Sequence, residues 1–227
     1  RISEETYLKP KPMIEIGGKP ILWHIMKIFS KNKVNDFIIC CGYKGYVIKE
    51  YFANYFLHMS DVTFDLKNNK VTVHQHNVEP WTVTLINNSK KTMTGGRLKR
   101  LEKYLKGEKF FLTYGDGLSS VNLKELLKFH NKKKKLVTMT AVRPPARFGA
   151  IKFNNDYVKY FKEKSKLDEG WINGGFFVME PEFLRFIKND KTFLEREPLE
   201  KACKKKQLVA YKHNSFWQCI DTKRDLD

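Results

Sequence analysis

The sequence predicts an α/β fold in which helices cover both faces of a mixed, mainly parallel β-sheet. Two observations carry this prediction. Residues 21–29 space their apolar side chains at helical intervals, and the short apolar run 37–41 lies between that segment and a second helical pattern at 47–56. Alternating helices and buried strands are typical of right-handed crossovers, which leave helices on both sides of a sheet. The 227 residues, 41% of them hydrophobic, suffice for one domain with a full-sized core.

The first part of the chain supplies these elements in order. Pro20 stands where a first helical turn tolerates proline, so we expect a helix over 21–29. Residues 37–41 form a buried strand that Gly42 closes, and a helix over 47–56 follows. From 62 to 87 apolar and polar residues alternate, which predicts a hairpin or a projecting β arm.

The rest of the chain continues the alternation. Helical spacing returns over 98–105, and the apolar run 110–114 is a buried strand that stops at Gly115. Asn122, with Glu125 three residues later, resembles a capping box that opens a helix through His130. The remaining expected elements are strands at 136–142 and 171–179, a hairpin of 150–153 with 157–162, and helices at 181–188 and 198–206. No repeat or linker separates them, so we expect a single domain over 1–227 with a β insertion at about 62–87.

The charge of the chain indicates an anionic partner. Lys and Arg number 43 against 25 Asp and Glu, a formal net charge of +18. Nucleic acid is one candidate, because neutralisation of phosphates by Lys and Arg dominates such binding. The lysines are, however, spread over almost every polar face, and the densest run, at 132–135, falls where a helix ends, which suits the helix dipole. We therefore expect no nucleic-acid partner, and we expect small phosphorylated substrates to use the same field.

Hydropathy and cysteine usage bound the location of the protein. No stretch approaches the roughly 18 uninterrupted apolar residues of a membrane span, and no charged-then-apolar leader opens the sequence. The four cysteines, Cys40, Cys41, Cys203 and Cys219, lack Cys-x-x-Cys spacing, and we expect them to be reduced, buried, small side chains. These features predict a soluble cytoplasmic protein without a membrane partner, a disulfide framework or a zinc site.

Lys11 is the first candidate for a phosphate contact. It lies between Pro10 and Pro12, which fix backbone angles and remove hydrogen-bond donors. A lysine held in this way can be directed at a phosphate. A solvated loop lysine is the alternative interpretation.

The segment 94–100, Thr-Gly-Gly-Arg-Leu-Lys-Arg, is the second candidate. Its glycine pair lets the backbone approach a ligand, and it combines a helix N-terminus with three cations, which suits an anion. The alternative is a helix start that contains glycines and turns its arginines to solvent.

Asp116 and Asp221 are the candidates for a metal site. Asp116 lies between two glycines after a buried strand, so its carboxylate is expected at the carboxyl end of the sheet, where α/β folds bind ligands. Asp221 follows the apolar run 216–220 and would supply a second oxygen ligand for Mg²⁺. An ordinary turn aspartate is the alternative for Asp116, and periodicity does not show that the two residues meet.

Taken together, these segments resemble the sugar-1-phosphate nucleotidylyltransferase family over nearly the whole chain. The family's lysine motif and first helix are similar to KPKPMIEIGGKPILWHIM, its next strand and helix to DFIICCGYKGYVIKEYF, and its metal-binding strand end to FLTYGDG. The cytidylyl branch of the family has segments that are similar to VEPWTVTLINN with MTGGRLKR, and to INGGFFV with FWQCIDT. The resemblance implies a Rossmann-like mixed sheet between helices, with a β-hairpin insertion.

The resemblance also implies roles for particular residues. Lys11 would contact the triphosphate and Arg97 would hold the leaving phosphates or the nucleotide, as the two catalytic cations. Asp116 and Asp221 would bind Mg²⁺, the expected cofactor. The expected nucleotide-binding residues are Arg1, Lys11, Thr94, Arg97 and Gly115. The expected residues around the sugar and its phosphate are Gly149, Glu163, Lys164, Asn173 and Gly174.

The reaction that the resemblance implies joins CTP and glucose-1-phosphate into CDP-glucose and pyrophosphate. A sugar-phosphate oxygen attacks the α-phosphorus of CTP in line, and no covalent protein nucleophile is required. Two polyanions must meet, so the protein's task is to position them and to cancel charge. A homo-oligomer, a trimer or a hexamer, is also implied, because the β insertion after Val62 resembles the family's subunit-contact region.

One departure from the family concerns the start of the chain. Family members begin with a strand that runs into a Gly-Gly-x-Gly-Thr-Arg loop around the nucleotide phosphates, and Arg1 matches the last residue of that loop. We expect the natural chain to carry the loop before Arg1. Three alternatives stay open: a catalytically silent regulatory or binding member of the family, the same reaction with another nucleotide or sugar phosphate, and a basic nucleic-acid-binding protein.

Overall fold

The computed structural model describes residues 7, 9–74, 78–89, 91–105, 107–144, 150–154, 157–162, 170–222 and 225, and of 150–154 and 157–162 the backbone alone. The chain divides into two compact units, Ser3–Lys90 and Lys91–Asp227 with Arg1–Ile2. Helices and strands are present in both, so the predicted mixed α/β class is confirmed. The organisation as one domain stays a prediction.

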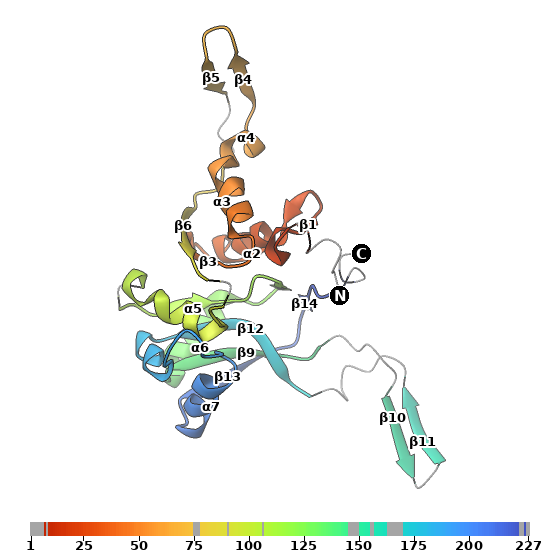
Figure 1. Cartoon of the computed structure of the whole chain (residues 1–227). Helices are drawn as coiled ribbons and strands as arrows, with labels where there is room; N and C mark the ends of the chain where they lie inside the picture. The colour runs from red at the N-terminus through yellow and green to blue at the C-terminus, as the bar shows by residue number, and fades with distance from the viewer. Residues whose placement is uncertain are drawn as a thin grey trace. The chain divides into compact units, whose positions relative to one another are not determined.

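The N-terminal unit is built around helix α2 (Ile21–Ser30) and the parallel strands β3 (Asp36–Cys41) and β6 (Thr82–Asn87) (Figure 1). Pro20 precedes α2 with a φ of −59°, which proline favours, so the predicted helix is confirmed. The other elements of this unit are η1 (Lys11–Met13), β1 (Glu15–Ile16), β2 (Lys19–Pro20), α3 (Gly45–Ala53), α4 (Tyr55–Met59), β4 (Val62–Asp65) and β5 (Lys70–Val73).

Two elements of this unit differ from the sequence predictions. The helix expected over 47–56 is divided at Asn54, whose φ of −101° and ψ of 15° lie outside the helical range. The hairpin expected from the alternation over 62–87 ends at Val73, and β6 pairs with β3 instead. The alternation in β6 has a different cause, because its Val83 and Leu85 pack against the core of the unit.

Strand β6 carries part of the sequence signature that resembles the cytidylyl branch. Trp81, directly before β6, packs against the core formed by Met13, Leu22, Met26, Cys41 and Ile48. Nearby, Trp23 Nε1 donates to the Tyr55 hydroxyl at 3.0 Å, and that hydroxyl donates to Glu79. The signature is therefore at least partly a packing and hydrogen-bonding unit of the fold.

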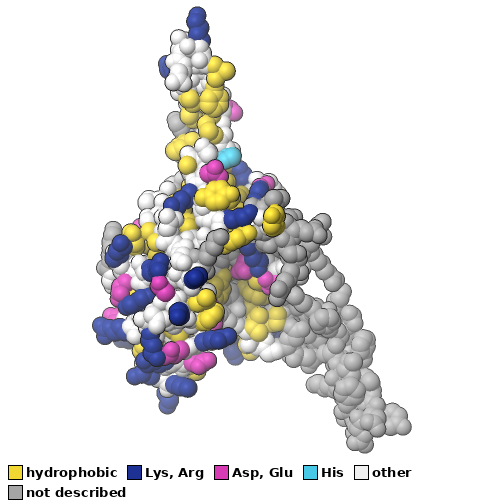
Figure 2. Space-filling view, viewed as in Figure 1, with side chains coloured by type: hydrophobic (Ala, Val, Ile, Leu, Met, Phe, Trp, Pro, Cys, Tyr) yellow, Lys and Arg dark blue, Asp and Glu magenta, His cyan; other side chains and the backbone are white. Residues whose placement is uncertain are grey.

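The hairpin of β4 and β5 exposes an apolar face. Val62 lies opposite Val73 and Phe64 opposite Val71, so the four side chains share one side of the ladder. Phe64 and Val71 are each 55% exposed. Figure 2 shows hydrophobic side chains gathered on this hairpin. Apolar surface of this kind is typical of a contact region.

The C-terminal unit contains a four-stranded mixed sheet in the order β13-β9-β12-β7. Strands β9 and β13 are parallel, and β12 is antiparallel to both β9 and β7 (Figure 1). Helices α6 and α7 pack beside the sheet. The bounds are β7 (Phe110–Leu112), α6 (Leu123–Lys133), β9 (Val137–Val142), β12 (Ile172–Met179), α7 (Glu197–Lys204) and β13 (Leu208–His213).

The remaining elements of this unit are not strands of that four-stranded sheet. They are α5 (Thr94–Arg100), η2 (Glu102–Tyr104), β8 (Gly117–Ser119), β10 (Ala150–Asn154), β11 (Tyr157–Lys162), η3 (Pro181–Phe186) and β14 (Trp217–Cys219). The hairpin predicted from 150–162 is confirmed as the antiparallel pair of β10 and β11. The helix expected over 181–188 is a shorter 3₁₀ helix, and strand β13 was not predicted.

The predicted cap of α6 is confirmed. The Asn122 side chain accepts the backbone N–H groups of Lys124 at 3.1 Å and Glu125 at 3.2 Å. The helix ends in lysines, as its charge pattern predicts. All four cysteines are reduced, as expected, but only Cys41 is buried. Cys40 and Cys219 are half-buried, and the expectation is wrong at Cys203, which is exposed on α7.

A buried polar cluster connects α6 to the sheet. His130 is 1% exposed, and its Nδ1 lies 2.8 Å from Thr138 Oγ1. Its Nε2 lies 3.1 Å from Glu180 Oε1, which also accepts from Lys109 Nζ at 2.9 Å. Burial raises the pKa of Glu180, but the bonds from Lys109 and His130 together outweigh that effect and hold the pKa below its ordinary value.

Among the helices of the described residues, none has both the length and the apolar character that crossing a membrane requires.

Candidate functional site

A short antiparallel ladder brings Asp116 and Asp221 together. Asp116 directly precedes β8, and Asp221 lies two residues after β14. Gly117 of β8 pairs with Cys219 of β14, and the Ile220 N–H donates to the Asp116 carbonyl oxygen at 2.9 Å. The pairing therefore sets the two aspartates side by side, although about a hundred residues of sequence separate them.

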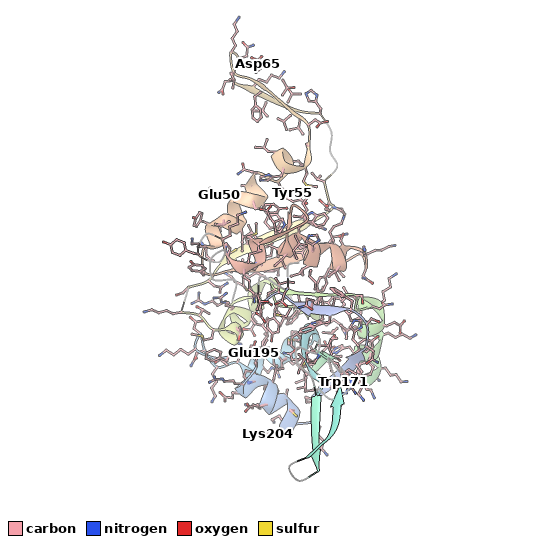
Figure 3. All side chains as sticks on the ribbon, turned by 90° about the vertical axis from the view of Figure 1, so that its right-hand side faces the viewer. Glu50, Tyr55, Asp65, Trp171, Glu195 and Lys204 are labelled. Atoms are coloured by element: carbon pink, nitrogen blue, oxygen red, sulfur yellow. The ribbon has the colours of Figure 1, made fainter. Side chains whose placement is uncertain are left out.

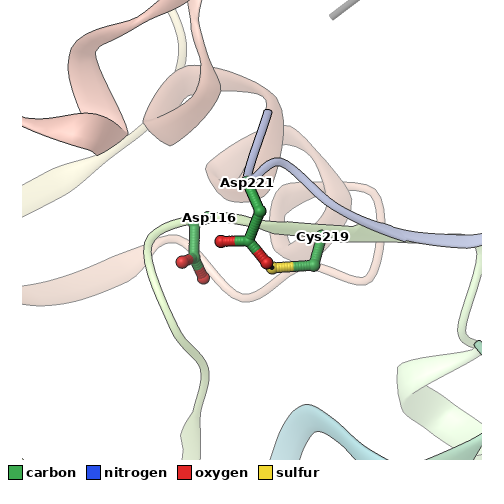
Figure 4. Close-up of side chains that lie close together, drawn as sticks. All are labelled: Asp116, Cys219 and Asp221. Carbon is green, nitrogen blue, oxygen red and sulfur yellow. Dashed lines mark hydrogen bonds between the residues drawn. The ribbon is translucent and has the colours of Figure 1, made fainter. Parts of the chain in front are cut away.

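The side chains of Asp116, Cys219 and Asp221 form a cluster of potential metal ligands (Figure 4). One ligand atom from each lies within 4.8 Å of the other two. Carboxylate oxygens are the ligands that Mg²⁺ prefers, whereas thiolate sulfur suits softer metals. The Cys219 thiol donates to Asp221 Oδ2 at 3.4 Å. The two carboxylates thus fit Mg²⁺, and Cys219 contributes a hydrogen bond to one of them.

Asp225 fixes the backbone that follows Asp221. Its Oδ2 accepts the N–H groups of Asp221 at 3.0 Å and Thr222 at 2.8 Å, and the Thr222 hydroxyl at 2.9 Å. Its Oδ1 accepts from Gln218 Nε2 at 3.0 Å. Asp225 therefore closes the turn in which Asp221 is held.

The glycine pair at the start of α5 contacts the protein's own backbone. The N–H groups of Gly95 and Gly96 donate to the Thr192 carbonyl at 3.0 and 3.2 Å. A Cβ atom at Gly95 would lie 2.8 Å from that oxygen, and one at Gly96 would lie 2.5 Å from Asp190 Cα. The glycines permit the close approach of residues 189–194, and both amides already have partners within the fold.

The cations of α5 also have partners. Arg100 donates two hydrogen bonds to the Asp190 carboxylate in a bidentate contact. These bonds hold the pKa of Asp190 below its usual range. Lys99 lies 2.8 Å from Glu102. Arg97 is half-buried, and its Nε donates to the Thr92 carbonyl at 3.0 Å, which fixes the direction of its side chain. Of the three, Arg97 is the one that the resemblance assigns to the nucleotide.

Glu195 connects Thr94 with Tyr114. Its Oε2 accepts from Thr94 Oγ1 at 2.7 Å, and its Oε1 accepts from the Tyr114 hydroxyl at 2.8 Å. Burial raises the pKa of Tyr114, and the charge of Glu195 and its hydrogen bond raise it further. The phenol is therefore protonated at neutral pH.

Asn173 and Gly174 lie at an irregular point of β12. The Asn173 amide nitrogen donates to the Tyr114 hydroxyl at 3.3 Å, and its oxygen accepts the Gly175 N–H at 2.9 Å. Gly175 has a φ of +85°, and a Cβ atom there would lie 2.9 Å from the Tyr114 ring. Trp217 Nε1 donates to the Gly174 carbonyl at 2.7 Å, so this part of β12 is joined to the start of β14.

Besides Arg97 on α5 and Gly174 on β12, the predicted site residues fall into three groups. The structure brings Asp116 and Asp221 together, with Gly115 adjacent in sequence, and it links Asn173 to Thr94 through Tyr114 and Glu195. Lys11, in η1, belongs to the N-terminal unit, and its role stays a prediction. The predicted residues that lie outside the described ones are Arg1, Gly149, Glu163 and Lys164.

No role was assigned from the sequence to Cys219, Asp225, Glu195 or Tyr114, the last of which directly precedes Gly115. Cys219 lies two residues before Asp221, a spacing that could have indicated it, because alternate residues of a strand share a face. Asp225 and Glu195 gave no local signal, since each reads as an exposed acid in a polar segment. Their roles depend on contacts that only the folded chain shows.

A family model described as nucleotidyl transferase matches residues 1–226. The glucose-1-phosphate cytidylyltransferase of Salmonella typhimurium is 55% identical over 226 residues, which cover 99% of this chain and 88% of that protein. The probable glucose-1-phosphate cytidylyltransferase of Bacillus subtilis is 41% identical over 227 residues, 100% of this chain and 89% of that protein.

Solved structures are similar in fold. HddC from Yersinia pseudotuberculosis has a TM-score of 0.68 at 22% identity, covering 95% of this chain and 86% of that one. The inositol-1-phosphate CTP transferase of T. maritima has a TM-score of 0.67 at 17% identity, covering 100% of this chain and 86% of that one. At these identities the likeness concerns the fold alone.

Proposed function

The chain belongs to the nucleotidyl transferase family, and we propose that it has glucose-1-phosphate cytidylyltransferase activity, forming CDP-glucose and pyrophosphate from CTP and glucose-1-phosphate. One observation carries this proposal: the carboxylates of Asp116 and Asp221 meet in a chain that is similar over its length to two proteins named for that activity. The proposal includes a cytoplasmic location and the finer fold expected above, a Rossmann-like, mainly parallel sheet between helices.

The chemistry asks the protein to bring two polyanions together. Mg²⁺ held by Asp116 and Asp221 would supply positive charge for the phosphates of CTP and of the departing pyrophosphate. The N–H···O bond of Ile220 to Asp116 and the turn closed by Asp225 keep the two carboxylates in place for this role. A site held by backbone pairing needs little rearrangement when the ion binds.

The cations have the complementary task. Arg97, whose direction is fixed by its bond to Thr92, holds the leaving phosphates or the nucleotide, and Lys11 contacts the triphosphate. The N–H groups of Gly95 and Gly96 at the start of α5 already donate to the Thr192 carbonyl. In this proposal, therefore, side chains rather than the N-terminus of α5 provide the positive charge for the phosphates. Arg1, Thr94 and Gly115 complete the proposed nucleotide site.

The sugar phosphate is held by a separate group of residues in this proposal. Glu163 and Lys164 contact the sugar and its phosphate, Asn173 and Gly174 line the same pocket, and Gly149 permits close approach. Asn173 has a fixed amide orientation, since both of its polar atoms are bonded within the fold. The attacking phosphate oxygen is positioned by these contacts, so no protein nucleophile takes part.

The proposed enzyme is a homo-oligomer, a trimer or a hexamer. The apolar face of the β4–β5 hairpin supports this part of the proposal, because Phe64 and Val71 are exposed in the single chain. On the face that Figure 2 draws, Lys and Arg are interspersed with Asp and Glu, a distribution that does not favour a nucleic-acid partner there.

The test is product formation by the full-length protein. CTP, glucose-1-phosphate and Mg²⁺ are supplied, CDP-glucose is quantified by chromatography, and pyrophosphate is measured in a coupled assay. We expect the highest kcat/KM with CTP, compared with UTP, dTTP and ATP. Equal or faster turnover with dTTP or ATP would overturn the choice of base. Absence of a nucleotide sugar with every nucleotide would favour the catalytically silent alternative.

A further inference from the structure

One carboxylate, that of Glu195, accepts hydrogen bonds from two hydroxyl groups far apart in the sequence. Tyr114 donates to one oxygen at 2.8 Å and Thr94 to the other at 2.7 Å. Each hydroxyl also accepts a bond: Tyr114 from Asn173 Nδ2 at 3.3 Å, and Thr94 from the Leu194 N–H at 2.9 Å. Figure 3 labels Glu195, which lies two residues before α7.

The charge of Glu195 sets the direction of its bonds with Tyr114 and Thr94 and, through Tyr114, of the bond with Asn173. An ionised carboxylate only accepts, so Tyr114 and Thr94 must each give it their one hydroxyl hydrogen. The Tyr114 oxygen can then only accept from Asn173, which must present its NH₂ group. On its other side Asn173 meets the Gly175 N–H, a donor, and must present its carbonyl oxygen there. Two independent contacts thus require the same amide orientation.

This orientation decides what Asn173 offers to a ligand. One amide hydrogen is directed at Tyr114 and one oxygen lone pair at Gly175, which leaves one hydrogen and one lone pair on the same amide. A flipped amide would exchange the two. A sugar that is positioned by this amide therefore depends on whatever prevents the flip.

We propose that Glu195 is a positioning residue for the sugar phosphate. Through Tyr114 it acts together with the Gly175 N–H to hold the Asn173 amide in the orientation that binds the sugar, and through Thr94 it connects Asn173 to the start of α5. The proposal rests on the proposed function, from which the role of Asn173 comes. Glu195 itself contacts no substrate in this account.

A purely structural role makes a different prediction. Glu195 is exposed, so the hydrogen bonds of a purely structural Glu195 would contribute little to the free energy of unfolding. Replacement of Glu195 would then change the melting temperature, if it changed anything. As a positioning residue its loss acts on the KM for glucose-1-phosphate, while the melting temperature changes little. The split between these two readouts distinguishes the two roles.

The experiment compares Glu195→Gln, which weakens the chain of bonds by removing its charge, with Tyr114→Phe, which interrupts it by removing the hydroxyl. Glutamine keeps the size and removes the charge, and phenylalanine keeps the ring that packs against Gly175. We expect each to raise the KM for glucose-1-phosphate about tenfold, as loss of a charge-assisted bond implies, with a smaller effect on kcat. The double variant should be no worse than the more affected single variant, because both changes act on one chain of bonds.

The matched control is Glu197→Gln, on the same segment. Glu197 is exposed and lies 2.7 Å from Lys188, outside the hydrogen bonds of Glu195. The KM of this variant for glucose-1-phosphate should therefore stay within about twofold of the wild-type value. Melting temperatures are measured for all variants.

A wild-type KM for glucose-1-phosphate in Glu195→Gln overturns the inference alone, provided that the wild-type protein makes CDP-glucose. Additive effects of the two changes, or an equal loss in Glu197→Gln, also overturn it. Absence of CDP-glucose with the wild-type protein overturns the proposed function, and the inference with it.

Discussion

Replacement of Gly96 by alanine would place a methyl group against the backbone of Asp190. The added carbon would lie 2.5 Å from Asp190 Cα and 2.6 Å from its carbonyl oxygen. Neither atom belongs to a flexible side chain, and the Met93 N–H holds the same carbonyl at 2.8 Å. The clash can be relieved only if α5 and residues 189–194 move apart.

The expected cost follows from this geometry. Overpacking costs roughly 1–3 kcal/mol, and contacts with backbone on this scale belong at the upper end. Alanine regains about 1 kcal/mol of helix propensity relative to glycine. The net loss of about 2 kcal/mol lowers the melting temperature by about 4–8 °C for a chain of this size. The same shift displaces the start of α5, so the kcat/KM for CTP falls as well.

The assay is thermal unfolding followed by circular dichroism, with steady-state kinetics on the same samples. Gly170→Ala is the matched control, because Gly170 is exposed and no described atom lies within 4 Å of the added methyl group. The packing argument would be refuted if Gly96→Ala had the melting temperature of the wild type. It would also be refuted if Gly170→Ala lowered the melting temperature by as much as Gly96→Ala.

Two further predictions concern Lys11 and Glu180. If Lys11 holds the triphosphate, Lys11→Ala lowers the kcat/KM for CTP by about a hundredfold or more at an unchanged melting temperature, whereas Lys19→Ala is milder. Near-normal kinetics for Lys11→Ala reject that role, and equal losses in both variants point to a general effect of charge. The pKa of Glu180 is lowered in the folded protein, so its contribution to stability is present above the ordinary value of 4.5 and is lost as the pH falls through the lowered pKa. In Glu180→Gln the free energy of unfolding should therefore fall less steeply as the pH is lowered. Denaturant unfolding between pH 3 and 7 measures this, with Glu182→Gln as the control. An unchanged pH dependence in Glu180→Gln would contradict the assignment.

Local sequence patterns predicted the elements that local forces decide. The helix α2, the strand β3 and the Asn122 cap follow from apolar spacing and side-chain chemistry within a few residues. The strand β13 was missed although its residues 208–211 form a short apolar run, and its pairing with β9 marks it as part of the sheet. Cys203 was expected to be buried from its residue type, but α7 places it on the solvent side.

The site shows the same division between local and long-range information. The sequence singled out Asp116 and Asp221 from their positions after apolar runs, yet their meeting depends on the pairing of two three-residue strands, β8 and β14. The glycine pair at 95 and 96 correctly indicated a close approach of backbone, but not that residues 189–194 make it. Glu195 gave no signal, because its partners Tyr114 and Thr94 lie 81 and 101 residues away.

The most direct test of the proposed metal site is the Mg²⁺ dependence of CDP-glucose formation in Asp116→Asn and Asp221→Asn. Each change removes one anionic charge from the pair at almost constant size, so folding is preserved while the site loses its hold on the cation. We expect each variant to lose about a hundredfold or more in kcat/KM at fixed Mg²⁺, whereas Asp61→Asn, an exposed aspartate of the N-terminal unit, keeps the wild-type rate. Wild-type turnover with an unchanged Mg²⁺ requirement in either Asp116→Asn or Asp221→Asn would contradict the proposed carboxylate site.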